Sequence, residues 1–122
     1  MPKYSICIDF DGVIHGYSKG WQGITNIYDL PVNGVKEFIE EARKEYKIIV
    51  HTIRLSEPDG YWAVSEWLKN NDIYYDDLCV SKPAAIAYID DRGIRFEGKF
   101  DGLLESIRTL KPWWKRNVDS DL

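Results

Sequence analysis

The chain contains little cysteine and little histidine, with two residues of each among 122. Cys7 and Cys79 lie inside apolar runs, where a small buried thiol is the usual explanation. Neither cysteine forms a pair of ligand-like spacing with the other or with His15 or His51, as a zinc site requires. A zinc-held structure is therefore not expected.

Long hydrophobic runs are also missing, and the N-terminus lacks the basic-then-apolar pattern of a secretory signal. We therefore expect a cytoplasmic protein with no membrane partner. The net charge of −4 argues against nucleic-acid binding over the whole surface. The composition, with 44% hydrophobic and 30% charged residues, and the length predict one globular domain over residues 1–122.

The hydrophobic pattern predicts strands that alternate with helices. Apolar runs of strand length occupy residues 3–10, 47–52, 77–83 and 85–91. Helical spacing of apolar residues predicts helices over 35–46, with Asn33 as its cap, over 61–70, and over 102–111, ending before Pro112. This order predicts an open parallel α/β sheet, with a core face on the third helix formed by Leu103, Leu104, Ile107 and Leu110.

Two segments fall outside this pattern. Residues 13–31 contain glycines and aromatic residues without a clear period, which indicates an excursion from the sheet, such as a small hairpin. Residues 112–122 form a tail containing Trp113 and Trp114, which we expect to fold back on the sheet. The tail also mixes aromatic with basic residues, so contact with nucleic acid or a second subunit is the alternative to packing on the sheet.

Polar residues follow every predicted strand. Ligands of open α/β sheets bind at the carboxyl ends of the strands, so these residues are candidates for a common site. Asp9 and Asp11 project to the same side, because side chains alternate along an extended chain. The remaining candidates follow the later strands: Thr52 and Arg54, then Lys82, then Asp90 and Asp91.

The chemistry of these side chains predicts a metal and a phosphoryl group. Four neighbouring carboxylates repel one another unless a cation neutralises them, and ligands that are all oxygen favour Mg²⁺. The hydroxyl, ammonium and guanidinium groups would then bind an anion held against the metal. One aspartate could attack phosphorus while the other transfers protons.

The segments DFDGV, VHTIR, SKP and IDDR resemble the four motifs of the haloacid dehalogenase superfamily, in the same order and at strand ends. The resemblance implies a Rossmann-like, three-layer open parallel sheet with helices on both faces. It implies that Asp9 is the nucleophile, in contact with Mg²⁺, and that Asp11 is the general acid/base, whose backbone carbonyl also binds Mg²⁺. An aspartate at position 11 favours a phosphatase over the dehalogenases and transport ATPases of the superfamily.

The resemblance also assigns the remaining motif residues. It makes Thr52 and Lys82 phosphate-binding residues, and it makes Asp91 the direct metal ligand with Asp90 in support. Since no large insertion follows the first or second motif, the chain resembles members without a large cap domain. The expected function is a Mg²⁺-dependent phosphomonoester hydrolase that forms an aspartyl-phosphate, with a small molecule or a nucleic-acid end as its phosphorylated substrate.

Two alternatives remain open at this stage. The Thr-x-Arg at 52–54 and the late IDDR are similar to the phosphatase half of bacteriophage polynucleotide kinase, which implies a nucleic-acid or nucleotide 3′-phosphatase. Arg54 is a candidate for contact with substrate phosphate in the main reading as well as in this one. In the 3′-phosphatase, His15, Tyr17 and Trp21 would form a flap that stacks on a base or sugar. The other alternative is a non-catalytic module that binds a nucleotide or phosphate. His51 is expected to pack beside the site without a chemical role, and no oligomeric state is predicted.

Overall fold

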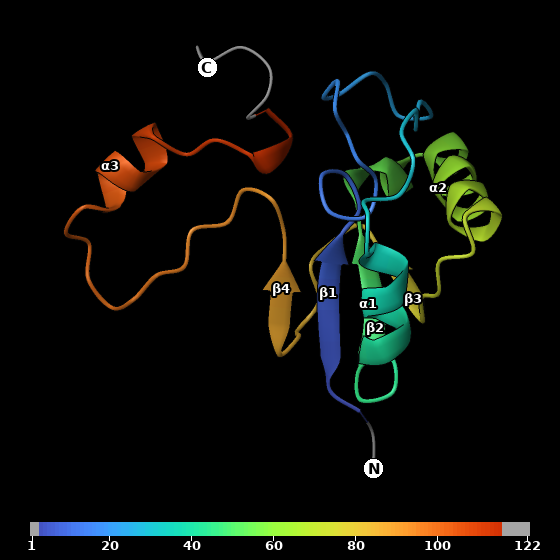
Figure 1. The fold of residues 1–122 in the computed structure, drawn as a ribbon, viewed down its shortest axis with the longest axis horizontal. Helices are drawn as coiled ribbons and strands as arrows, with labels where there is room; N and C mark the ends of the chain where they lie inside the picture. Colours follow the sequence, from blue (N-terminus) through green and yellow to red (C-terminus); the bar gives the residue numbers. More distant parts are fainter. Residues whose placement is uncertain (1–2, 116–122) are drawn as a thin grey trace.

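A computed structural model describes residues 3–115 of the chain. At its centre is a four-stranded parallel sheet in the order β3-β2-β1-β4, which confirms the predicted open parallel α/β sheet (Figure 1). Each strand is shorter than the apolar run that predicted it. The strands are β1 (Ser5–Asp9), β2 (Lys47–His51), β3 (Asp77–Cys79) and β4 (Ala87–Ile89).

Two helices cover one face of this sheet. Helix α1 (Val35–Ala42) connects β1 to β2, and α2 (Pro58–Asn70) lies between β2 and β3. Both crossovers step in the same direction along the sheet, so right-handed connections place both helices on the same face. The buried core joins alternate strand positions to both helices: Ile6, Ile8, Ile48 and Val50 from the strands, with Val35, Ile39, Val64 and Leu68.

The third helix, α3 (Leu103–Arg108), forms as predicted but does not pack on the sheet. It stands away from β4 on an arm, and none of its residues is buried (Figure 1). The prediction that Leu103, Leu104, Ile107 and Leu110 form a core face is therefore wrong. The expectation of helices on both faces is also wrong for residues 3–115, because the short connection from β3 to β4 contains no helix.

Local chemistry explains where the helices begin. Gly34, with a φ of 89°, precedes α1, so a residue that tolerates a left-handed backbone starts this helix in place of the predicted Asn33. Helix α2 begins at Pro58, earlier than predicted, because proline suits the first turn of a helix. Between β2 and α2, Thr52 caps the short 3₁₀ helix η1 (Ile53–Ser56). No helix within residues 3–115 has the length and apolarity needed to cross a membrane.

Candidate functional site

A pocket of about 230 Å³ lies at the carboxyl edge of the sheet. It collects residues from the ends of β1 and β2 and from the loop after β4, as the parallel topology predicts. Lys82 and Asp90 do not line this pocket, but the charges of both act on the pKa of Asp9, which does. The lining includes Asp9, Asp11, Thr52 and Asp91 from the predicted motifs, together with Tyr17, Trp21, His51 and Arg92.

Asp9 is paired with His51 across the two central strands. The residues are in register at the ends of β1 and β2, and His51 Nδ1 lies 2.9 Å from Asp9 Oδ1. His51 Nε2 lies 3.1 Å from the Val80 carbonyl, which can only accept, so we assign the N–H to Nε2. The contact between Nδ1 and the carboxylate then requires one more proton, shared by His51 and Asp9.

Burial raises the pKa of Asp9, and the hydrogen bond with His51 opposes this rise without cancelling it. The sequence analysis gave His51 no chemical role, and the structure places it in contact with the predicted nucleophile. Strand register is the signal that could have identified it, because His51 ends the strand that pairs with β1.

Asp11 is held by two other side chains. Arg54 donates from Nε to Asp11 Oδ2 at 2.9 Å and from Nη2 to Oδ1 at 3.1 Å. His15 Nδ1 lies 2.9 Å from Oδ1, and its Nε2 accepts the backbone N–H of Asp29 at 3.1 Å, so we assign a neutral ring with its hydrogen on Nδ1. Burial alone would raise the pKa of Asp11, but the bonds from His15 and Arg54 outweigh it and lower the pKa.

Arg54 does not contact the pocket as predicted. Its side chain is 0% exposed, and its Nη1 donates to the carbonyls of Gly23 and Ile24, each at 2.8 Å. The predicted contact of Arg54 with substrate phosphate is therefore wrong, because its guanidinium is used inside the protein. Gly60 lets α2 approach the backbone of η1 closely, since a Cβ there would lie 2.0 Å from the Arg54 carbonyl oxygen.

The predicted aromatic flap is mostly packed into the fold. His15 is 0% exposed, so its predicted stacking on a base or sugar is wrong. Tyr17 is buried and packs edge-on against Trp114, although it also lines the pocket. Trp21 is 49% exposed, and its ring lies 4.8 Å from the Arg54 guanidinium. Of the three predicted flap residues, Trp21 presents the most exposed ring to a ligand.

Asp90 and Asp91, the late acidic pair, make different contacts. Asp91 lines the pocket, and its Oδ2 accepts a 2.6 Å hydrogen bond from Trp114 Nε1. Asp90 instead accepts the backbone N–H groups of Arg92 and Gly93 and lies 3.3 Å from Lys82 Nζ. Burial would raise the pKa of Asp90, but these bonds outweigh it and lower the pKa. The position of Asp91 suits the direct ligand role that the motif predicted.

The C-terminal tail folds back on the edge of the sheet, as predicted. Trp113 Nε1 donates to the Gly12 carbonyl at 2.6 Å, and the ring of Trp114 is buried. Gly12 is needed here, because a Cβ would lie 2.2 Å from Asp91 Oδ2 and its φ is 85°. The rest of the tail, residues 116–122, lies outside the described residues.

Three further groups can bind an anion near Asp9. Thr52 is buried, lines the pocket and accepts the Arg54 backbone N–H at 3.1 Å, which leaves its own hydroxyl hydrogen to donate. Lys82 is half-exposed, and its charge acts to lower the pKa of Asp9. Arg92 is exposed at the pocket, so its guanidinium is a candidate for the phosphate contact that we predicted for Arg54. Its place after two aspartates at a strand end was the available signal.

Three carboxylates line the pocket, and those of Asp9 and Asp91 offer an oxygen to a metal ion, because His15 and Arg54 occupy both oxygens of Asp11. Asp9 and Asp91 both line it, and each has one carboxylate oxygen outside the hydrogen bonds described above. Within residues 3–115 no group of three or more His, Cys, Asp or Glu side chains is arranged to hold a metal ion. Mg²⁺ in phosphate-processing sites commonly uses one or two carboxylates with substrate and water, so these two residues fit it.

Comparisons with models of protein families, with curated proteins and with solved structures found no match for this chain. The resemblance to the haloacid dehalogenase superfamily therefore rests on the four motifs and on the α/β topology. It stays a prediction.

Proposed function

We propose that this protein is a cytoplasmic, Mg²⁺-dependent phosphomonoester hydrolase of the haloacid dehalogenase type that forms an aspartyl-phosphate on Asp9. One observation carries the proposal: Asp9, Thr52 and Asp91 come from three separate strand ends and line one pocket. A nucleophile, a hydroxyl donor and a metal-binding carboxylate are the groups that phosphoryl transfer needs together.

In the first step, a carboxylate oxygen of Asp9 attacks phosphorus as the bond from phosphorus to the leaving oxygen breaks. The Thr52 hydroxyl and the Arg92 guanidinium donate to the phosphoryl oxygens, and Lys82 adds positive charge beside Asp9. When bound by Asp9 and Asp91, Mg²⁺ would neutralise charge between the carboxylates and the phosphoryl group.

Asp11 serves the second step, in which water attacks phosphorus and the bond between phosphorus and Asp9 breaks. The hydrogen bonds from His15 and Arg54 keep its carboxylate ionised, the form that accepts a proton from that water, and they also make it a weaker base. The same arrangement opposes its predicted role as a proton donor in the first step. We therefore expect a preference for substrates with good leaving groups, which depart without a proton.

A non-catalytic phosphate-binding module is the second candidate. Arg54 and His15 bond to both oxygens of the Asp11 carboxylate, and this observation favours the module. An aspartate held in this way can have a structural role that needs no proton transfer. Such a module would keep the anion-binding groups Thr52, Lys82 and Arg92 and lack turnover. Among the predicted flap residues, Trp21 still supports the 3′-phosphatase alternative, because its ring is half-exposed at the pocket.

The deciding experiment measures p-nitrophenyl phosphate hydrolysis by the wild type and by Asp9→Asn, each with Mg²⁺ and with EDTA. Turnover that needs Mg²⁺ and disappears in Asp9→Asn supports the hydrolase. A panel of phosphorylated metabolites and 3′-phosphorylated oligonucleotides then ranks substrates. Inorganic phosphate that binds in calorimetry, with no turnover of any substrate, would replace the hydrolase by the binding module.

A further inference from the structure

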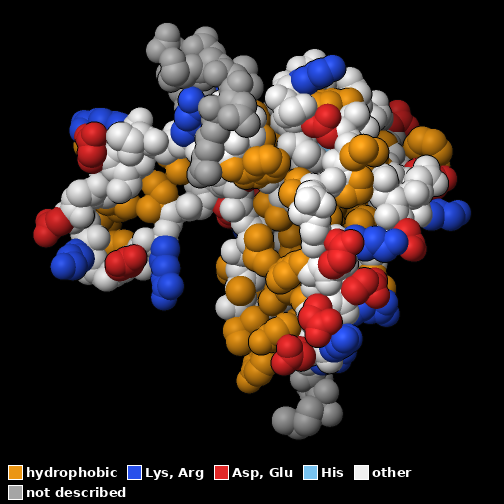
Figure 2. Space-filling view, in the orientation of Figure 1, with side chains coloured by type: hydrophobic (Ala, Val, Ile, Leu, Met, Phe, Trp, Pro, Cys, Tyr) orange, Lys and Arg blue, Asp and Glu red, His pale blue; other side chains and the backbone are white. Residues whose placement is uncertain are grey.

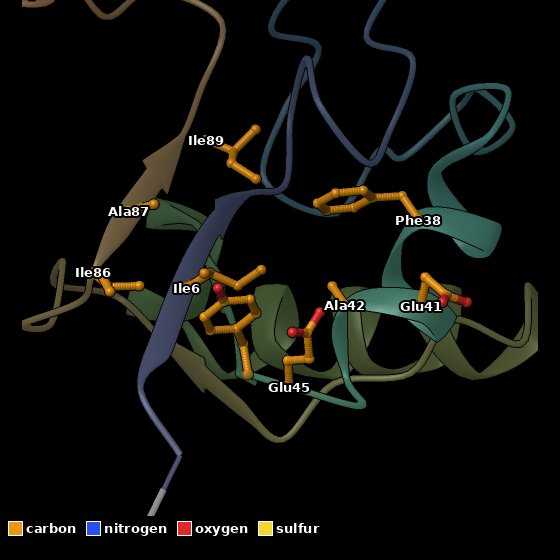
Figure 3. Close-up of a pocket in the computed structure, with 9 residues that line it drawn as sticks. Ile6, Phe38, Glu41, Ala42, Glu45, Ile86, Ala87 and Ile89 are labelled. Carbon is orange, nitrogen blue, oxygen red and sulfur yellow. The ribbon is translucent and has the colours of Figure 1, made fainter.

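The chain leaves the sheet after β4 and returns to it at the tail. Between these points, residues 92–112 form an arm that contains α3 and stands away from β4 (Figure 1). Figure 2 shows the arm as a separate lobe with hydrophobic side chains of its own. No residue of the arm lines the apolar groove between α1 and β4, where Phe38 and Ile86 lie on opposite sides (Figure 3). The C-terminal end of the arm is instead attached to the edge of the sheet by two tryptophans of the tail.

These tryptophans begin the short 3₁₀ helix η2 (Trp113–Lys115) and donate their indole N–H groups to two different motifs. Trp113 donates to the Gly12 backbone carbonyl and Trp114 donates to Asp91 Oδ2, each at 2.6 Å. The ring of Trp114 is buried, so its N–H requires an acceptor. That acceptor is a carboxylate that we predict to bind the metal ion, and a charged acceptor makes the bond stronger than one to a carbonyl.

Trp114 determines how the Asp91 carboxylate is held. Within residues 3–115, the bond from Trp114 is the one hydrogen bond of the Asp91 side chain. Asp90, by contrast, is bonded to Lys82 and to two backbone N–H groups. Gly12 lies against the same oxygen of Asp91, because a Cβ there would lie 2.2 Å from Asp91 Oδ2 and 3.0 Å from Trp114 Nε1. Oδ2 is thus fixed between the indole and Gly12, and Oδ1 is the oxygen that remains for a metal ion.

The ring of Trp114 also contacts two other residues that line the pocket. Tyr17 packs edge-on against it with the ring centroids 4.9 Å apart, and the Arg92 guanidinium lies 5.7 Å from the centroid of the Trp114 ring.

We propose that Trp114 is a positioning residue of the proposed phosphatase, whose indole N–H holds Asp91 so that its Oδ1 can bind Mg²⁺. This role rests on the proposed function, because it takes Asp91 as the metal ligand. Hydrogen-bond partners of metal ligands typically change metal affinity by about 10- to 100-fold. The tail would therefore complete the metal site from outside the four motifs.

Mn²⁺ binding to the full chain, followed by electron paramagnetic resonance, tests this role without any substrate. Mn²⁺ is the probe because it takes the same oxygen ligands as Mg²⁺. Trp114→Phe removes the N–H and keeps an aromatic ring, and it should raise the Kd for Mn²⁺ about 10-fold. Trp113→Phe is the matched control, because it removes an indole N–H from the same tail whose acceptor is a backbone carbonyl, and it should leave the Kd unchanged. An unchanged Kd in Trp114→Phe, equal increases in both variants, or a wild type that binds no Mn²⁺ would overturn the proposal.

A second replacement keeps the test decisive if the smaller ring of Trp114→Phe disturbs the fold. The unnatural residue β-(3-benzothienyl)alanine has sulfur in place of the indole N–H and nearly the same shape, so at position 114 it removes the bond and keeps the packing against Tyr17. It should raise the Kd for Mn²⁺ as Trp114→Phe does, with unchanged far-ultraviolet circular dichroism. A wild-type Kd in this variant would refute the role of the N–H.

Hydrolysis of p-nitrophenyl phosphate separates positioning from a merely structural role. In Trp114→Phe the Mg²⁺ concentration for half-maximal rate should rise by a factor similar to that of the Kd, while kcat at saturating Mg²⁺ falls less. A lower kcat with an unchanged Mg²⁺ requirement would contradict the proposal. A wild type that binds Mn²⁺ but hydrolyses no substrate would refute the hydrolase alone, and the Kd comparison would still decide the role of Trp114.

Discussion

Asp9 and Asp11 lie two positions apart at the end of one strand, and each lies 2.9 Å from the Nδ1 atom of a histidine. The two pairs nevertheless hold different numbers of protons. His51 donates from its far nitrogen to the Val80 carbonyl, whereas His15 accepts a backbone N–H at the same position. The Asp9 pair therefore shares an additional proton, and the Asp11 pair does not.

The second partner explains the rest of the difference. Asp11 receives two hydrogen bonds from the buried guanidinium of Arg54, while Asp9 has a lysine nearby that bonds to Asp90. Burial raises the pKa of Asp9. Burial would also raise the pKa of Asp11, but the hydrogen bonds from His15 and Arg54 lower it. The surroundings of the two carboxylates, and not their residue type, thus give them different pKa values. Two aspartates can serve different steps of one reaction for this reason.

The largest expected effect comes from neutralising each carboxylate in turn. We expect Asp9→Asn to lower kcat for p-nitrophenyl phosphate by about 1,000-fold or more, because it removes the nucleophile. Asp11→Asn should lower kcat less, because it removes the base for the attacking water in the second step but leaves the nucleophile in place. Steady-state kinetics of both variants measure the ratio. Equal losses in the two variants would contradict the separate roles assigned to Asp9 and Asp11.

Removing the cation beside Asp11 should weaken the fold. Arg54→Leu leaves a buried carboxylate without its partner, and breaking a buried ion pair in this way costs about 3–5 kcal/mol. The exposed pair of Lys44 and Glu41 is the control, because Lys44→Leu should cost less than about 1 kcal/mol. Urea unfolding gives both free energies. A loss below 1 kcal/mol in Arg54→Leu would show that Arg54 does not hold Asp11.

The sequence alone predicted the features of the two aspartate sites that depend on local pattern. Apolar runs predicted β1 and β2, and parallel topology placed Asp9, Thr52 and Asp91 at one edge. The direction of a long side chain depends on what surrounds it, so the sequence did not predict that Arg54 points away from the pocket, into the protein.

The contact of His51 with Asp9 and the position of α3 could not be predicted from the sequence. The contact of His51 with Asp9 depends on strand register, which the hydrophobic pattern alone does not fix. The spacing of apolar residues in α3 predicted that the helix has an apolar side, which is correct. It did not specify what covers that side, so the predicted packing of α3 on the sheet was wrong.

The pH dependence of the two carboxylates should have opposite signs. The lowered pKa of Asp11 means that its ionised form stabilises the fold fully above its unfolded pKa of about 3.9, and this stabilisation is lost as pH falls through the folded value. The raised pKa of Asp9 means that stability falls as pH rises from the unfolded pKa through the folded value. Carboxyl ¹³C titration should place Asp9 above and Asp11 below the ordinary value, and the reverse order would be inconsistent with the hydrogen bonds described.

The smallest expected effect lies on the Asp11 side, where Arg54 connects that carboxylate to Trp21 through the cation–π contact. Trp21→Ala should raise KM for a 3′-phosphorylated oligonucleotide several-fold, because base stacking on an exposed ring contributes about 1–3 kcal/mol. KM for p-nitrophenyl phosphate should hardly change, since that substrate has no base to stack. Trp62→Ala, on the surface of α2, should change neither value. Equal increases for both substrates in Trp21→Ala would instead indicate that Trp21 acts through Arg54 and Asp11, so the comparison separates substrate recognition from support of the site.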